Sequence, residues 1–497
     1  MKQQLHAPLL KQRRAGVLLH ISSLPSAHYV GDLGEEAYRF VDFLHDIGAT
    51  VWQTLPINMP HADNSPYQAL SAFAGNPDFI SLEALQAQGL LLRKADTDGL
   101  ITSKIQLLAS AYEAFKIRAE KKEQRDFTAF CKKQAHWLDD FALFLALRGK
   151  FNQSGWHTWP EAYKNRDAKT LKQAHKELAH EIAVIQFTQF VFFTQWLSLK
   201  AYAATKNVYL FGDIPIFVAY DSADVWAQPH LFKLDADKNM TVVAGVPPDY
   251  FSATGQRWGN PHYNWQAMAA DGYAWWISRM ATQNELFDIV RIDHFRGLEA
   301  AWEIAASEDT AINGQWVLAP GDELLAAIKQ ALPNICLVAE DLGIITDKVN
   351  ALRNKYNLPG MKILQFAFSG AEDNPYLPQN IDENSVVYTG THDNDTTLGW
   401  HINLDEHQRG HFHRYLSATH SEEHQPDIPA DLINMALASA ANLAIIPMQD
   451  ILALDSSHRM NTPGTSSGNW HWRFNWQQLS AAQESMMTEA IARTGRK

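Results

Sequence analysis

The stretch that decides the fold is ELFDIVRIDHFRG, residues 285–297. Its apolar run, residues 286–292, ends in Asp293 with polar neighbours on both sides. An apolar run that ends in charge predicts a buried parallel strand whose carboxyl end opens into a site. The pattern recurs in CLVAEDLG, residues 336–343, where Glu340 closes the run, and in VVYTGTHDND, residues 386–395, where Asp393 follows it.

The chain carries eight strand-like runs in all. They are residues 16–21, 50–56, 208–218, 287–292, 335–340, 361–368, 385–389 and 443–449. Helix-compatible stretches, such as residues 35–46, 272–285 and 322–332, separate most of them. Strands that alternate with helices predict a parallel sheet, and eight of them favour a closed α/β barrel, the (β/α)₈ TIM barrel, over an open doubly wound sheet.

We expect residues 1–497 to form one catalytic barrel domain with two departures from the alternation. Residues 60–204 are rich in helix formers and predict a largely helical insertion on the loop after the second strand. Residues 246–263, VPPDYFSATGQRWGNPHY, contain Pro, Gly and Asn and predict an irregular active-site loop that carries Tyr250 and Trp258.

Composition narrows the functional classes. The net charge of −13 argues against nucleic acid or an anionic membrane as partner. Two cysteines, Cys131 and Cys336, exclude a disulfide framework. The first 16 residues lack an apolar stretch of signal-peptide length, and no segment approaches the roughly 18 apolar residues of a membrane span. We therefore expect a cytoplasmic enzyme, a monomer or a weak homo-oligomer.

The 16 Trp and 15 Tyr fit a large core, and they also suit stacking on sugar rings.

Paired carboxylates suggest the chemistry. Cleaving a glycosidic bond needs an acid to protonate the leaving oxygen and a carboxylate to meet the positive charge at the anomeric carbon. Arg291 lies two residues before Asp293, on the same strand face, and would hold Asp293 ionised. Glu340 follows five apolar or small residues, so burial would raise its pKa. The alternative is that these are ordinary charges at strand ends.

Ten ordered motifs carry a resemblance to a known family. They are SSLPS (22–26), WQTLPI (52–57), SPYQALSAFAGNP (65–77), GDIPIFV (212–218), VPPDYFSATGQRWGNP (246–261), VRIDHFRG (290–297), AEDLG (339–343), LPGMKILQFAF (358–368), THDNDT (391–396) and RMNTPGTSSGNWHWR (459–473). Together they resemble the amylomaltases, or disproportionating 4-α-glucanotransferases, of glycoside hydrolase family 77 in the α-amylase superfamily.

The resemblance implies a role for each of three carboxylates. Asp293 matches the family's nucleophile, Glu340 its general acid/base, and Asp393 the carboxylate that stabilises the transition state. Asp395, two residues further on, matches loop structure. The matching substrate-binding positions are Tyr67, Asp213, Asp249, Tyr250, Gln256, Trp258, Arg291, His294, His392 and Asn461.

The resemblance also implies retaining transfer of α-1,4-glucan segments between maltooligosaccharides, without metal or organic cofactor. His407 and His411 have helical i, i+4 spacing, but no HExxH pattern or nearby Cys accompanies them, so a solvated helix face is the simpler interpretation. Ala253, Leu298 and Ala301 depart from residues common in the family and bear on acceptor preference.

Two other functions stay open at this point. One is a non-catalytic glucan-binding protein on a degenerate barrel, although such a protein needs no acid, nucleophile and stabiliser together. The other is an α-1,4-glucan hydrolase, which would share the same covalent intermediate.

Overall fold

A computed structural model describes residues 9–26, 30–91, 103–248, 252–419, 426–465 and 467–496. Its centre is a parallel eight-stranded sheet in the order β10-β11-β12-β1-β2-β3-β6-β9. The strands are β1 (Arg14–Leu18), β2 (Val51–Gln53), β3 (Tyr209–Ile214), β6 (Ile289–Ile292), β9 (Leu337–Ala339), β10 (Gly360–Ile363), β11 (Ser385–Tyr388) and β12 (Leu443–Pro447). Ala339 N–H donates to Pro359 O at 2.9 Å, which brings the two edges of the sheet together. The predicted (β/α)₈ barrel is confirmed.

Alternate residues of the strands fill two separate layers. Val51, Phe211, Ile289 and Val338 belong to a cluster inside the barrel. Their neighbours along each strand, including Trp52, Leu210, Val290 and Leu337, belong to the larger cluster between the sheet and the helices. Both faces are thus buried, which explains why the sequence shows nearly continuous apolar runs rather than alternation.

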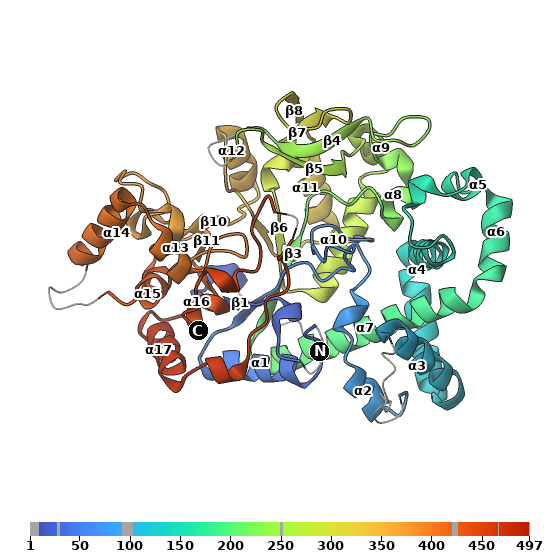
Figure 1. Ribbon diagram of the computed structural model, residues 1–497, viewed down its shortest axis with the longest axis horizontal. Coiled ribbons are helices and arrows are strands. Elements are labelled where there is room, and N and C mark those ends of the chain that lie inside the picture. Colours follow the sequence, from blue (N-terminus) through green and yellow to red (C-terminus); the bar gives the residue numbers. More distant parts are fainter. Residues whose placement is uncertain are drawn as a thin grey trace.

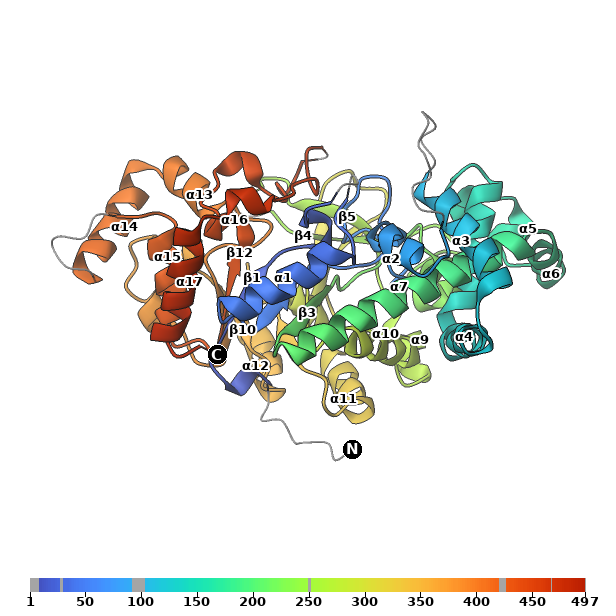
Figure 2. The ribbon, with the colours of Figure 1, turned by 90° about the horizontal axis from the view of Figure 1, so that it is seen from below.

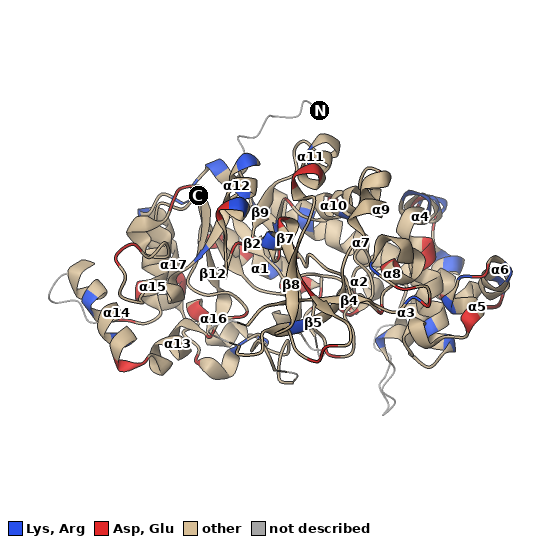
Figure 3. Cartoon of the chain, turned by 90° about the horizontal axis from the view of Figure 1, so that it is seen from above, with Lys and Arg blue, Asp and Glu red and all other residues tan. Residues whose placement is uncertain are grey.

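Helices surround the sheet, as Figures 1 and 2 show. The expected helices are present as α1 (Glu35–Asp46), α10 (Ala274–Leu286) and α11 (Gly321–Ala331). Further helices outside the segment between β2 and β3 include α9 (Trp265–Ala270), α12 (Asp347–Lys355), α13 (Thr397–Asn403), α14 (Glu406–Thr419), α15 (Ala430–Ala438), α16 (Met448–Ile451) and α17 (Ala481–Arg493). Figure 3 shows acidic and basic residues interspersed over these helices.

Between β2 and β3 the chain forms a helical lobe, on the right of Figure 1. It contains α2 (Leu82–Ala87), α3 (Lys104–Arg118), α4 (Lys121–Lys150), α5 (Glu161–Lys164), α6 (Ala168–Glu177) and α7 (Ala179–Thr205). Helix α7 returns along the barrel, where Trp196 Nε1 donates to Leu286 O at 2.8 Å and Tyr202 donates to Asp42 at 2.7 Å. The last helix of the lobe is therefore also a helix of the barrel wall.

The expectation that no segment has the length and apolarity of a membrane span was wrong for α7. Residues Ala179–Thr205 reach a mean hydropathy of 1.4 over an 18-residue window, and half of that window is buried inside the protein. Phe192, Trp196 and Leu199 are almost fully buried. Packing against the barrel on one side and the lobe on the other accounts for this apolarity.

A second, antiparallel sheet with the order β5-β4-β7-β8 was not predicted. Its strands are β4 (Val242–Val246), β5 (Gln256–Pro261), β7 (Ala300–Ala305) and β8 (Gly314–Leu318). The segment 246–263, expected to be irregular, is therefore partly a strand. Its sequence QRWGNP lacks the signal because Gly, Asn and Pro are poor strand formers, and pairing with β4 overrides local preference.

Candidate active site

Hydrogen bonds between neighbouring strand ends bring two of the predicted carboxylates together. Asp293 N–H donates to Ile214 O at 2.9 Å, just beyond β3 and β6. Glu340 N–H donates to Ile292 O at 3.1 Å, which extends the same ladder to β9. Asp293 and Glu340 therefore occupy adjacent positions at the carboxyl edge of the barrel, where the sites of this fold lie.

Arg291 links two carboxylates beneath this edge. Its Nη2 atom lies 2.9 Å from Asp293 Oδ1, and its Nη1 atom lies 2.6 Å from Asp213 Oδ2. The guanidinium is buried, with only 5% of its side chain exposed. A buried charge needs such partners, so the three side chains fix one another's positions.

Tyr67 joins this group from the loop after β2. Its hydroxyl donates to Asp213 Oδ2 at 2.8 Å and lies 2.9 Å from His392 Nε2. The rings of Tyr67 and His392 are nearly parallel, with centroids 5.3 Å apart. Two loops more than 300 residues apart in sequence are thereby held together beside Asp213.

Burial raises the pKa of Glu340 to about 7; Arg291 opposes this shift and Asp293 adds to it. The two carboxylate oxygens accept from the backbone N–H groups of His294 at 2.7 Å and Leu342 at 2.9 Å, so the carboxyl orientation is fixed. A carboxyl with this pKa can give and take a proton near neutral pH.

The pKa values of Asp213 and Asp293, the two carboxylates bound to Arg291, are also raised. Burial raises the pKa of Asp213 to about 7, against the effect of Arg291. Burial likewise raises the pKa of Asp293, and Arg291 is the largest influence in the opposite direction. The ion pair between Arg291 and Asp293 that the sequence predicts is present, but it offsets only part of the increase in the Asp293 pKa that burial causes.

Asp393 and Asp395 have different environments. Asp393 Oδ1 accepts from Asn461 Nδ2 at 2.7 Å, and its other oxygen lies 3.4 Å from His392 Nε2. Nearly half of the Asp393 side chain is exposed, at 47%. Asp395 instead accepts from Ser456 at 2.8 Å and Asn403 at 3.3 Å, as a residue that supports its loop.

The residues that the resemblance assigns to the acceptor side of the site lie only partly within the described residues. Trp258 packs edge-on against His294 with ring centroids 4.9 Å apart, and its Nε1 donates to Gln256 at 3.2 Å. His294 has a left-handed backbone, φ 51°, and burial lowers its pKa to about 3. Asp249 and Tyr250 lie outside the described residues. Of the departures from the family pattern, Leu298 and Ala301 are buried and Ala253 is exposed.

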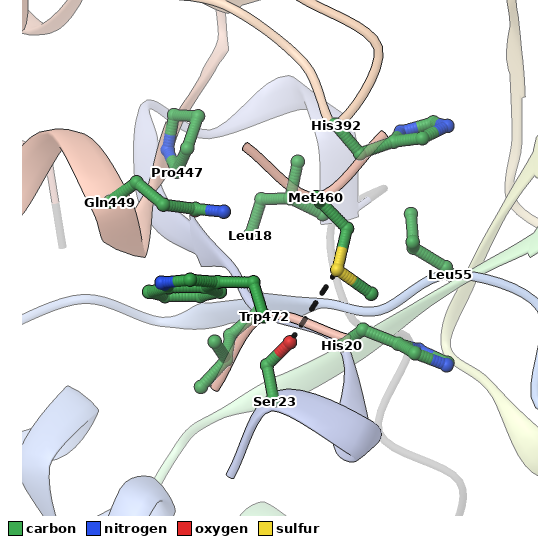
Figure 4. Close-up of a pocket in the computed structure, with 10 residues that line it drawn as sticks. Leu18, His20, Ser23, Leu55, His392, Pro447, Gln449, Met460 and Trp472 are labelled. Atoms are coloured by element: carbon green, nitrogen blue, oxygen red, sulfur yellow. Dashed lines mark hydrogen bonds between the residues drawn. The ribbon is translucent and has the colours of Figure 1, made fainter. Parts of the chain in front are cut away.

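Sequence reasoning missed several side chains near His392. Trp470 lies 5.9 Å from Tyr67 and 6.1 Å from His392, measured between ring centroids. His20 and Trp472 line a small cavity of about 20 Å³ below His392, which Figure 4 shows, and a cavity of this size suits one water molecule. Both tryptophans belong to RMNTPGTSSGNWHWR, so this motif carried the signal that could have found them.

The histidines of α14 do not join the site. His407 and His411 lie 3.1 Å apart at Nε2 on an exposed face. Within the described ranges, no group of three or more His, Cys, Asp or Glu side chains could hold a metal ion.

Fold and site together define a class: an enzyme that acts on glycosidic bonds, with its carboxylates at the carboxyl edge of a (β/α)₈ barrel. The model of the family described as 4-alpha-glucanotransferase matches residues 19–479. The chain belongs to this 4-α-glucanotransferase family.

Individual relatives agree with the family assignment. A 4-alpha-glucanotransferase of Thermus thermophilus is 46% identical over 97% of this chain and 99% of its own. One from Synechocystis is also 46% identical, over 98% and 99% of the two chains. The solved structure of an amylomaltase from Streptococcus agalactiae in complex with acarbose is 35% identical, covers 98% of this chain and 100% of its own, and has a TM-score of 0.92.

Proposed function

We propose that this enzyme transfers α-1,4-glucan segments between maltooligosaccharides by a retaining double displacement. The observation that carries the proposal is the grouping of Asp293 and Glu340 at adjacent strand ends, with Arg291 bonded to the first and Asp393 held nearby. The names of the relatives support the substrate class.

In the first displacement, Asp293 attacks the anomeric carbon of the donor and forms a glycosyl ester. Glu340 gives its proton to the glycosidic oxygen, so the leaving chain departs as an alcohol. The pKa of about 7 supports this role, because much of the acid is protonated near neutral pH. Arg291 holds one oxygen of Asp293 and leaves the other for attack.

In the second displacement, Glu340, now ionised, takes the proton of an acceptor hydroxyl. That oxygen attacks the anomeric carbon and releases Asp293, which restores the α configuration. Asp393, anchored by Asn461, accepts hydrogen bonds from ring hydroxyls of the bound sugar. Tyr67 supports the sugar from the side, as a ring already fixed by Asp213 and His392.

Transfer and hydrolysis differ only in the molecule that attacks the glycosyl ester in the second displacement, which is a sugar in transfer and water in hydrolysis. Incubation with maltotriose alone tests the function: a transferase produces glucose together with longer oligosaccharides while the number of reducing ends stays constant. A hydrolase increases the number of reducing ends, and a glucan-binding protein leaves maltotriose unchanged. Either of these last two results would contradict the proposal.

A further inference from the structure

A second hollow, of about 190 Å³, lies between α4, α8 (Ala223–Ala227) and α10. Figure 1 shows α8 next to α4 and α10 at the junction of the barrel and the helical lobe. None of the residues assigned above to the catalytic site lines it. The hollow is therefore a separate feature that the transfer reaction leaves unexplained.

Three aromatic side chains form its walls. Phe73 stacks on Trp137 with ring centroids 6.0 Å apart and 9° between their planes. Trp275 stands at 88° to Phe73, with centroids 6.1 Å apart. All three are at most 5% exposed, so packing already holds them in place. Because the rings pack on one another, each exposes only a small part of its surface to the hollow, and these parts together form a rigid apolar wall against which a pyranose ring can pack.

Polar groups lie beside these walls. Asp224 is buried and accepts from Ala72 N–H at 2.8 Å and from Trp275 Nε1 at 3.3 Å, so its carboxylate is oriented and retains acceptor capacity. The side chains of Gln228 and Ser278 make no hydrogen bond within the described part of the chain. Carboxylate, amide and hydroxyl groups together match the hydroxyls of a sugar.

The charge of the lining disfavours anions. Its charged members are Asp140, Asp224 and Asp271, with no Lys or Arg among the described lining residues. Asp140 pairs with Arg166 at 2.5 Å, and this ion pair limits the attraction of the hollow for a cation. The volume lies below the roughly 300–1,000 Å³ of drug-sized sites, so it suits a single ring.

One segment connects the hollow to the catalytic site. Residues 65–77 place Tyr67 beside Asp213 and, a few residues later, place Ser71 and Phe73 in the hollow. Between these points Leu70 O accepts from Ala223 N–H at 2.9 Å, which fastens the segment to α8.

We propose that this hollow binds one terminal glucosyl unit of an α-glucan, as a second and non-catalytic sugar site. The proposal rests on the α-glucan substrates of the proposed function. It gives the enzyme an attachment point for its substrate outside the catalytic centre.

Equilibrium dialysis of the full chain with radiolabelled maltose tests this, with Asp293→Asn present throughout to stop turnover. The number of maltose molecules bound by Asp293→Asn alone is the reference, because the donor and acceptor sides of the catalytic centre can each hold maltose. Adding Ala274→Trp, which fills the hollow from its exposed rim, should lower that number by one. The matched control Ala326→Trp, at an exposed position of α11 that does not line the hollow, should leave it unchanged.

The same number of bound maltose molecules with and without Ala274→Trp overturns the second site. An equal loss in Ala326→Trp also overturns it, because the loss would then not depend on the hollow. Gln228→Ala, which enlarges the hollow, should weaken the second maltose by about 5-fold with an unchanged melting temperature; an unchanged affinity would contradict the assigned contact.

Discussion

Arg291 Nη2 lies 2.9 Å from Asp293 Oδ1, and within the described residues Asp293 Oδ2 has no hydrogen-bond or ion-pair partner. One oxygen of the carboxylate is therefore anchored and the other is available for bond formation. The same guanidinium also binds Asp213 at 2.6 Å, and Asp213 binds Tyr67. The orientation of Asp293 thus depends on side chains from three strands or loops.

Replacing the proposed nucleophile tests the first displacement. Asp293→Asn keeps the shape of the side chain but removes the charge that attacks the anomeric carbon. Transfer from maltotriose should fall by on the order of 10⁴-fold, while maltotriose binding measured by dialysis changes little. Transfer within about 10-fold of the unmodified enzyme would exclude Asp293 as nucleophile.

The pH profile tests the proton donor. Because the first step needs protonated Glu340, kcat/KM should fall as pH rises through its pKa of about 7. Glu340→Gln should cost about 10²–10⁴-fold with maltotriose. With α-glucosyl fluoride, whose leaving group needs little protonation, the variant should form the glycosyl-enzyme readily and lose the alkaline decline. A profile that keeps this decline would assign it to another group.

Stability should depend on pH through the same residue. The pKa of Glu340 is raised in the folded state, so the folded protein binds more protons than the unfolded chain between about pH 4.5 and 7. Its contribution to the free energy of unfolding therefore decreases as pH rises through that range. The melting temperature of Glu340→Gln minus that of the unmodified protein should therefore increase from pH 5 to pH 8. A difference that stays constant would show that Glu340 has an ordinary pKa.

Asp393 and Asp395 form a matched pair for substitution. Asp393→Asn should lower kcat by at least about 10²-fold with little change in melting temperature, since the side chain is half exposed and faces the site. Asp395→Asn should mainly lower the melting temperature, because it weakens the bonds to Ser456 and Asn403. Equal effects of the two changes on both measurements would show that the assignment of Asp393 is wrong.

The barrel could be predicted from sequence because its strands are buried on both faces. In β12, Leu443–Pro447, every residue is apolar and buried, whichever face of the sheet its side chain points to. The antiparallel sheet could not be predicted, because Gln256–Pro261 becomes a strand only through pairing with β4. Likewise, α7 resembles a membrane span because it packs on two sides.

Contacts in the site could be predicted from the sequence where the two residues lie close together on one strand. Arg291 and Asp293 share a strand face, so their contact follows from local geometry. The bridge from Tyr67 to His392 does not, since it depends on how two distant loops approach each other. The direction of the Asp293 pKa shift was also missed, because burial around a strand end depends on the surrounding loops.

A sugar and water compete to attack the glycosyl-enzyme in the second displacement. Water is present at far higher concentration, so a transferase must position the sugar and shield the glycosyl-enzyme. Trp258 is suited to this, because β5 holds it edge-on against His294, whose backbone N–H binds Glu340. Trp258→Ala should therefore raise the ratio of hydrolysis to transfer from maltotriose, measured as new reducing ends per glucose released. Trp316→Ala, on β8 of the same sheet and 38% exposed, is the matched control and should leave that ratio unchanged. If both rates fall together in Trp258→Ala, the tryptophan only supports the sheet, and acceptor selection lies elsewhere on the barrel rim.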